Sequence, residues 1–451
     1  MDLIYTLGVT AFALALLIAI HEYGHFWVAR RCGVKVLRFS IGFGTPLLRW
    51  RDKLDTEYVI AAIPLGGYVK MLDEREAEVP AAELPMAFNR KPVLQRMAVV
   101  SAGPIANLLL AVLAYWFIFL SGESGVAPVI GEVQSGSVAE VAGLEAGQEL
   151  VAIDGRETPT WQAVNYRLLD RIGDSGPISF TVRYPGSDML YRSEGNLDDW
   201  LRQAEEPDLL RGLGITMYRP PVLPRLETVV EGSPAAAAGL ARGDLVVSAD
   251  GTPMPSWNDW VDYVQARPEQ TIALRFERDG VTMETDLTPA RKVDANGEAY
   301  GQVGVGVQVP EWPDEMLRSF SYGPLQALGK AVNRTGELVV FTLNSIKKML
   351  TGLISHKNLS GPITIAKVAT ASAQSGLESF VGFLALLSVS LGVLNLLPVP
   401  VLDGGHLMYY TIELLRGRPV SEKVQVAGYQ IGLFIIIGIM MLALYNDFAR
   451  L

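Results

Sequence analysis

The sequence predicts a polytopic α-helical membrane protein with four transmembrane helices, a membrane-associated β-hairpin or sheet region and two tandem copies of a small α+β domain. Three observations predict this fold class: the composition, four long apolar runs and an internal repeat. Of the 451 residues, 49% are hydrophobic and only 19% are charged, which is unusual for a soluble enzyme of this size.

Four uncharged runs are long enough to cross a bilayer, and they cover residues 3–20, 97–121, 379–402 and 424–445. The first run lacks a basic leading segment and a small-residue cleavage site, so we interpret it as a retained helix and not a signal peptide. Lys and Arg cluster between the first two runs, and such residues near membrane ends stay in the cytoplasm. We therefore expect this loop inside the cell and both termini outside it.

The β region is predicted directly after the first run. Residues 34–44 and 56–72 alternate or run in β-branched and aromatic residues, with Gly and Pro between them, as strands joined by turns do. Further along, residues 324–350 show helical spacing of apolar residues with interspersed Lys and Arg. This pattern predicts an amphipathic helix on the outer membrane surface or under the repeats.

An internal repeat occupies the long segment between the second and third runs. “SGSVAEVAGLEAGQELVAIDG”, which starts at Ser135, and “EGSPAAAAGLARGDLVVSADG”, which starts at Glu231, match at many positions. Each predicts a turn, a short helix, a Gly-marked turn and a strand that ends in Asp-Gly. Each copy resembles a PDZ domain of the bacterial kind, and whether its groove binds a peptide stays open.

These patterns divide the chain into nine segments. We expect a first transmembrane helix at 1–33, a cytoplasmic β region at 34–90, a second transmembrane helix at 91–121, PDZ-like domains at 126–220 and 221–310, an amphipathic segment at 311–377, a third transmembrane helix at 378–405, a cytoplasmic loop at 406–423 and a fourth transmembrane helix at 424–446.

Charge and cysteine content exclude two other classes. The net charge of −10, without a basic patch interleaved with aromatics, argues against a nucleic-acid partner. The single cysteine, Cys32, rules out an internal disulfide framework. The bilayer is therefore the first expected partner.

A group of titratable residues lies at the inner end of the first run, in “IAIHEYGHFW”. His21 and His25 stand four residues apart, so on a helix they share one face, as a divalent-metal chelate requires. Glu22 beside them completes the H-E-x-x-H zinc pattern, in which it can reach a metal-bound water. Because ionisable groups at membrane depth are costly, they usually have a function.

A catalytic zinc site needs a third protein ligand and keeps one open position. The first and third runs cross the membrane in the same direction, so their C-terminal ends meet on one face. Asp403 is the first charge after the third run, and Pro398 and Pro400 before it break the helix. We expect Asp403 to be the third ligand, with His406 as the alternative. Asn395 either caps the broken helix or hydrogen-bonds a substrate backbone.

With “HEYGH” at 21–25, “NLLPVPVLDGGH” at 395–406 and the PDZ-like copies between them, the chain resembles the site-2 protease family of intramembrane zinc metalloproteases (M50-like) over essentially its whole length. The resemblance implies one Zn²⁺ per chain on His21, His25 and Asp403, with Glu22 as the catalytic acid/base.

The resemblance also implies how a substrate is held. Asn395 is expected to bind it. Gly42, Phe43 and Gly44 match a glycine-flanked phenylalanine in a membrane-dipping β-hairpin that engages the substrate strand. Strand residues between 34 and 72 could pair with a substrate segment that has unwound from its helix.

The implied substrates are single-span transmembrane proteins, typically an anti-sigma factor already trimmed by a periplasmic first-site protease in the envelope stress response, and remnant signal peptides. The implied location is the bacterial inner membrane, with both termini periplasmic and the zinc site near the cytoplasmic side. The PDZ-like pair would filter substrates by size or bind a C-terminal peptide. The rival interpretations are a PDZ membrane scaffold with a structural metal and a zinc transporter.

Overall fold

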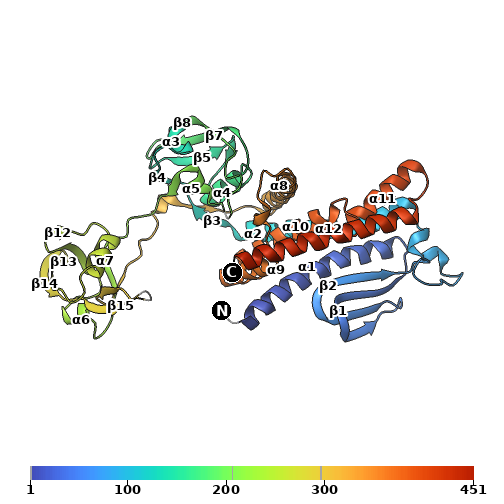
Figure 1. Cartoon of the computed structure of the whole chain (residues 1–451), viewed down its shortest axis with the longest axis horizontal. Helices are drawn as coiled ribbons and strands as arrows, with labels where there is room; N and C mark the ends of the chain where they lie inside the picture. Colours follow the sequence, from blue (N-terminus) through green and yellow to red (C-terminus); the bar gives the residue numbers. More distant parts are fainter. Residues whose placement is uncertain (1–2, 206, 295–296, 451) are drawn as a thin grey trace.

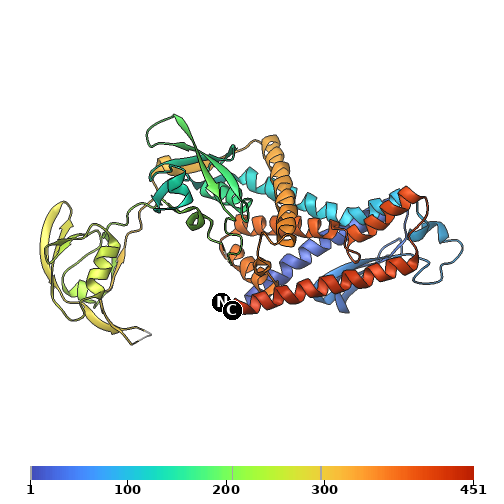
Figure 2. The same cartoon turned by 45° about the horizontal axis from the view of Figure 1, so that its top comes forward.

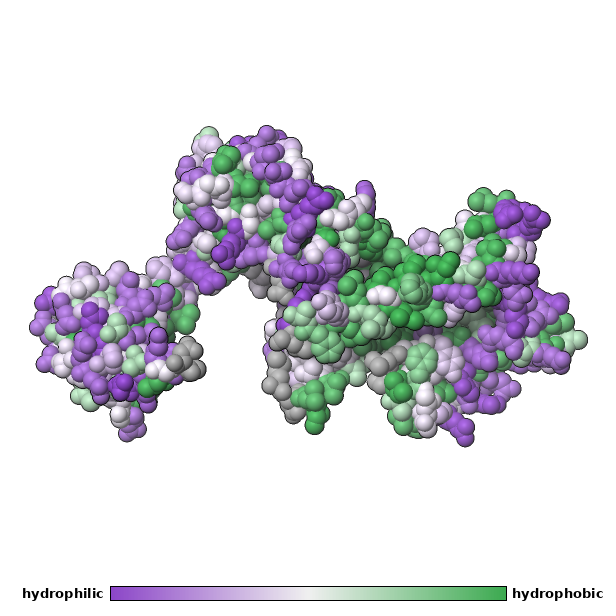
Figure 3. Space-filling view, in the orientation of Figure 1, coloured by the Kyte–Doolittle hydropathy of each residue, from purple (hydrophilic) through white to green (hydrophobic). Residues whose placement is uncertain are grey.

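The computed structural model describes residues 3–205, 207–294 and 297–450 (Figure 1), so the terminal residues 1–2 and 451 of the predicted topology lie outside it. Four helices within this part are long and apolar enough to cross a membrane. They are α1 (Leu3–Arg31), α2 (Val93–Ser121), α10 (Leu377–Leu396) and α12 (Glu422–Ala449). Hydrophobic residues cover much of the helical part on the face seen in Figure 3. The four predicted apolar helices are confirmed.

The third of these helices ends earlier than the apolar run does. Helix α10 stops at Leu396, whereas the run continues to Leu402. Proline lacks an N–H and keeps the residue before it out of the helical conformation, so Pro398 and Pro400 turn 397–402 into an irregular loop. A short helix, α11 (Asp403–Arg416), begins after this loop.

Helices α1 and α2 approach each other closely through glycines. A Cβ on Gly24 would overlap the carbonyl oxygen of Ala102, and a Cβ on Gly103 would overlap the ring of His25. Small residues permit such contact between membrane helices, where packing and not water exclusion drives association. On the other side of α2, the Ser388 hydroxyl of α10 donates to the carbonyl oxygen of Asn107 at 2.7 Å. Helix α2 therefore lies between α1 and α10.

Two long antiparallel strands, β1 (Val36–Arg51) and β2 (Glu57–Met71), form the β region beside α1 (Figure 1). Both strands bend, so that each contributes two segments to the sheet. Residues 36–41 pair with 67–71 on one side and with 57–60 on the other. Residues 46–51 pair with the far side of 57–61. The curled sheet therefore has two outer strands, 46–51 and 67–71. The second of these lies against α1.

Two small units follow α2, and their first seven elements come in the same order. The first contains β4 (Ile130–Val133), α3 (Val138–Val141), β5 (Glu149–Ile153), β6 (Arg156–Glu157), α4 (Trp161–Leu169), β7 (Gly176–Arg183), β8 (Leu190–Leu197), α5 (Leu209–Leu213) and β9 (Ile215–Met217). The second contains β10 (Leu226–Val229), α6 (Pro234–Ala237), β11 (Leu245–Ala249), β12 (Thr252–Pro253), α7 (Trp257–Gln265), β13 (Ile272–Arg278), β14 (Val281–Leu287), β15 (Ala290–Val293), β16 (Ala299–Gln302) and β17 (Val305–Val307).

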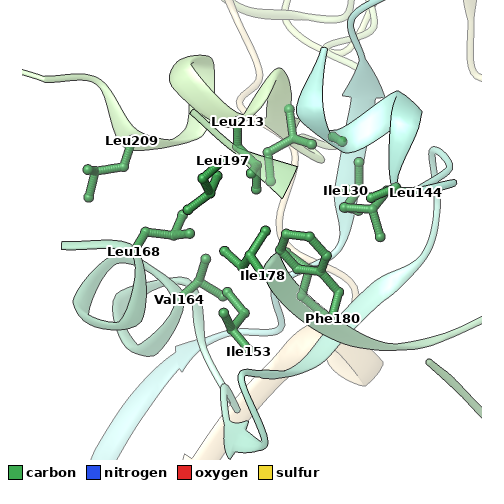
Figure 4. Packing of buried hydrophobic residues seen from close by; sticks show 14 of the residues in the cluster. Ile130, Leu144, Ile153, Val164, Leu168, Ile178, Phe180, Leu197, Leu209 and Leu213 are labelled. Atoms are coloured by element: carbon green, nitrogen blue, oxygen red, sulfur yellow. The ribbon is translucent and has the colours of Figure 1, made fainter. Parts of the chain in front are cut away.

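Each unit has a four-stranded sheet, in the orders β6-β5-β7-β8 and β12-β11-β13-β14. Each also has its own core. In the first unit Ile178 and Phe180 of β7 pack against Val164 and Leu168 of α4 (Figure 4). The inward residues of β7 alternate along the strand, which is the pattern of a strand with one face on the core.

The first unit is held against the helical part by ionic contacts. They reach α8 (Pro324–Leu350) and a small sheet of β3 (Glu123–Val126) with β18 (Leu317–Phe320). The Lys348 ammonium donates to the carbonyl oxygen of Asp170 at 2.6 Å and pairs with Asp174 at 2.6 Å. Burial alone would raise the pKa of the Glu149 carboxyl group. The hydrogen bonds that Arg183 and Arg318 donate to it outweigh burial, so the pKa of Glu149 lies below its ordinary value. The second unit lies farther from the helices (Figures 1 and 2).

The remaining elements are short helices. They are η1 (Leu84–Met86), η2 (Phe88–Arg90), η3 (Asp314–Met316), η4 (His356–Asn358) and α9 (Pro362–Gln374).

Helix α12 is held at its C-terminal end and at Gly432 in its N-terminal half. At the C-terminal end the Asp447 carboxylate accepts from the N–H groups of Gly361, Ile363 and Thr364, which caps α9. Toward the other end Gly432 packs so closely on the 397–402 loop that a Cβ there would overlap the carbonyl oxygen of Pro400.

We predict that Gly432→Ala lowers the free energy of unfolding of the detergent-solubilised protein by about 1–3 kcal/mol, because the added methyl group overpacks this contact. The measurement is the unfolding temperature. Gly438 is the matched control, since it lies on the same helix and a Cβ added there would have nothing within 4 Å. Gly438→Ala should be neutral or slightly stabilising, as alanine favours helix over glycine. Equal unfolding temperatures for the two variants would contradict the prediction.

Candidate metal centre

Two imidazoles face each other on the C-terminal half of α1. His21 and His25 are one helical turn apart, and their Nε2 atoms are 3.2 Å apart. Both side chains are buried, with 9% and 8% of their surface exposed. The glycine-mediated contact with α2 closes one side of the pair, because a side chain at Gly103 would occupy the space of the His25 ring.

Asp403, the first residue of α11, brings a carboxylate to this pair. Its Oδ2 atom is 3.2 Å from His21 Nε2 and 3.5 Å from His25 Nε2. Among the described residues these three form the one group of His, Cys, Asp or Glu side chains whose donor atoms could share a metal ion. The structure thus brings together the three residues that the sequence predicted as ligands.

The donor atoms fit a zinc ion in both distance and chemistry. Tetrahedral zinc with ligands at about 2.0–2.2 Å places neighbouring ligand atoms about 3.3–3.6 Å apart. The three observed separations are 3.2, 3.2 and 3.5 Å. The Asp403 Oδ2 atom is buried without a hydrogen-bond donor in the described part of the chain, and such an atom needs compensation. Two imidazoles and one carboxylate leave the fourth position open, as in catalytic sites.

The far sides of both rings are held by α2. The Nδ1 atom of His25 is 2.8 Å from the carbonyl oxygen of Val99. The Nδ1 atom of His21 is 3.1 Å from the side-chain amide of Asn107, which is fully buried. Asn107 is not among the residues predicted from the sequence, although an amide inside an apolar run is itself a signal of function.

Glu22 lies between the histidines and the β region. Val69 on β2 lies near its carboxyl group. A Cβ on the neighbouring Gly67 would lie 3.1 Å from Cγ of Glu22. The acid next to the candidate ligands therefore meets the outer strand 67–71 of the curled sheet.

The other predicted site residues lie outside the three-residue group. Asn395 is in the last turn of α10 and half-buried. Phe43 stacks on Tyr68 with ring centroids 6.1 Å apart, and its flanking Gly42 and Gly44 have φ angles of 89° and 86°, which glycine adopts without strain. His406, the alternative ligand, is exposed one turn after Asp403.

The loop that carries Asp403 is strained and supported. Val401 has a φ of 135°, which is costly for a β-branched residue and typical of functional sites. Arg96 of α2 pairs with Glu413 of α11 at 2.6 Å, and its guanidinium lies over the ring of Tyr410. Together with Gly432 of α12, these contacts fix α11 and the loop before it.

Comparison with solved structures finds PDZ domains of low similarity. The PDZ domain of an SdrC-like protein from Listeria monocytogenes is 20% identical, covers 20% of this chain and 92% of its own, and has a TM-score of 0.17. The corresponding domain from Listeria innocua is 22% identical, covers 20% and 98%, and also has a TM-score of 0.17.

Comparison with whole proteins gives much stronger matches. The Regulator of sigma-E protease RseP of Escherichia coli is 47% identical over 439 residues, which is 97% of both chains. The Regulator of sigma E protease of Haemophilus influenzae is 42% identical over 451 residues and all of both chains. The profile of Peptidase family M50 matches residues 9–439. This chain therefore belongs to peptidase family M50 and is a zinc metalloprotease.

Proposed function

We propose that this metalloprotease hydrolyses peptide bonds within the transmembrane segments of single-span membrane proteins. The observation that carries the proposal is the group of His21, His25 and Asp403. Its three donor atoms lie 3.2–3.5 Å apart, and two of the residues stand on a helix apolar enough to cross a membrane.

We assign one Zn²⁺ per chain to His21, His25 and Asp403, and the acid/base role to Glu22. When bound, zinc supplies a Lewis acid for the scissile carbonyl group and lowers the pKa of a water molecule to about 7. Glu22 takes the proton from the attacking water as its oxygen bonds to the carbonyl carbon. It then gives that proton to the departing amine nitrogen as the C–N bond breaks.

The outer strand 67–71 is the proposed support for the substrate segment. A peptide bond in a helix is shielded by its hydrogen bonds, so the substrate must unwind before cleavage. No further strand pairs with 67–71 on the α1 side within the described residues. An unwound segment can add to this edge, next to Glu22. Gly42–Phe43–Gly44 and Asn395 are the proposed further contacts with the substrate.

The two outer units, at 126–220 and 221–310, are proposed as PDZ-like domains that exclude substrates with bulky outer parts. The contacts of Lys348 with Asp170 and Asp174 hold the first unit near the helices. A substrate that still carries a large outer domain would have to pass this pair before it reached the site.

We place the protein in the bacterial inner membrane, with both termini in the periplasm and the zinc site near the cytoplasmic side. The concentration of Lys and Arg between α1 and α2 supports this orientation. The remaining segments are assigned as a cytoplasmic β region at 34–90, a periplasmic helical segment at 311–377 and a cytoplasmic segment at 406–423.

The names of the relatives from Escherichia coli and Haemophilus influenzae support a role in regulated intramembrane proteolysis, since both are called regulator of sigma-E protease. The proposed substrate is an anti-sigma factor already trimmed by a periplasmic first-site protease, with remnant signal peptides as a second class. The rival role, a scaffold whose metal is structural, differs in one respect: it does not need Glu22.

We predict that Glu22→Gln retains zinc but lowers the rate of cleavage of a single-span substrate at least about 100-fold, since a positioned general base contributes about 10²–10⁴. Zinc content and cleavage are measured on the same purified protein. His25→Ala is the control that should lose both. Undiminished cleavage by Glu22→Gln would sink the assigned mechanism.

We predict that Gly67→Pro slows cleavage about fivefold with unchanged zinc content, because proline removes one N–H from the proposed docking edge. Gly67→Ala is the matched control: it adds the same Cβ near Glu22 but keeps the N–H. The docking role is refuted when the two variants cleave at equal rates.

Deletion of residues 127–310 should allow cleavage of substrates that have not been trimmed, while trimmed substrates are cut as before. The deletion keeps β3 paired with β18, so residues 311–316 can close the connection. The assay compares one substrate with and without its outer domain. Loss of cleavage of the trimmed form would show that the units recognise substrates and do not filter them.

A further inference from the structure

Asn107 is a buried amide of which, in the described part of the chain, only the nitrogen has a hydrogen-bond partner. It lies in the middle of α2 with none of its surface exposed. Its Nδ2 atom is 3.1 Å from Nδ1 of His21, and its Oδ1 atom has no partner among the described residues. A buried polar group of this kind is costly in an apolar surrounding, so its position next to His21 requires a reason.

The chemistry of His21 decides which end of the amide should face it. The Nε2 atom of His21 points at Nε2 of His25 and Oδ2 of Asp403. A neutral imidazole that offers its Nε2 lone pair to a metal carries its proton on Nδ1. That N–H needs an acceptor, and the amide oxygen becomes one when the amide turns by half a rotation about its Cβ–Cγ bond.

We propose that Asn107 is a positioning residue of the zinc site: its side-chain oxygen accepts the hydrogen bond from Nδ1–H of His21 and thereby fixes the tautomer and the orientation of that ring. The carbonyl oxygen of Val99, 2.8 Å from Nδ1 of His25, does the same for the second ligand. Val99, Gly103 and Asn107 follow one another at intervals of four, so they share one face of α2 and meet both histidines.

Residue 107 also has a contact that does not involve the metal site. Its backbone carbonyl oxygen accepts from the Ser388 hydroxyl at 2.7 Å, which joins α2 to α10. Ser388→Ala removes this contact and leaves the amide of Asn107 in place. The Ser388→Ala variant therefore measures how loss of the contact between α2 and α10 alone affects zinc binding.

The inference rests on the proposed zinc ligands, and the experiment measures zinc binding instead of proteolysis. Zn²⁺ affinity is determined for the full-length chain in detergent by competition with a chelator, and thermal unfolding of the metal-free form shows that each variant is folded. Asn107→Leu keeps the number and branching of the side-chain heavy atoms but removes the acceptor, and we expect it to weaken zinc binding about 10–100-fold. Asn107→Asp, which only accepts when ionised, should bind zinc within a few-fold of the wild type.

Ser388→Ala should also bind zinc like the wild type. The proposal is overturned when Asn107→Leu binds as tightly as the wild type, when Asn107→Asp is as weak as Asn107→Leu, or when Ser388→Ala is weakened to the same degree. If Asn107→Leu does not fold, Asn107→Ala takes its place in the comparison. Absence of zinc binding by the wild type would refute the proposed ligand set itself, which separates that failure from failure of this inference.

Discussion

The contact between α1 and α2 is the constraint on which the candidate metal centre depends. Gly24 and Gly103 remove the side chains that would hold the two helices apart. At this short separation the carbonyl oxygen of Val99 on α2 contacts the ring of His25. The buried side-chain amide of Asn107, on the same face of α2, contacts the ring of His21. A bilayer offers no water to solvate an imidazole or carboxylate, so every polar atom must be satisfied within the protein. Close helix packing supplies a partner on α2 for each imidazole.

The third candidate ligand, Asp403, reaches the two histidines because the chain leaves its helix before it. A continuous helix would carry Asp403 past the histidines, but Pro398 and Pro400 end α10 early and start a new helix at the carboxylate. The resulting loop contains a strained residue, Val401. Strain of about 1–3 kcal/mol persists only where the surroundings determine the conformation. Here they are Gly432 of α12 and the ion pair that ties α11 to α2.

Local spacing and topology predict part of this arrangement from the sequence. The four-residue interval of His21 and His25 fixes a shared helix face, and the common direction of the first and third runs brings Asp403 to the same side. Hydropathy alone would extend α10 to Leu402, but Pro398 and Pro400 indicate from the sequence that the helix breaks earlier, and it ends at Leu396. Asn107 is not among the predicted residues: its amide inside an apolar run is a signal of function, but a hydrogen bond between residues on different helices leaves no periodic trace in the sequence. Only the three-dimensional register of α1 and α2 shows that its partner is His21.

Helix α2 therefore has more than a spanning role. It orients one ring through a backbone carbonyl and the other through an amide, and it anchors the helix that bears the carboxylate through Arg96 and Glu413. A metal site assembled from separate helices is only as rigid as the element that they share. That rigidity matters for catalysis, because a shift of about 1 Å in a reacting group lowers the rate about 10²-fold. The outer units have their own cores, so their movement need not disturb this assembly. The proposed selection of substrates by these units and the geometry of the metal centre can then vary independently.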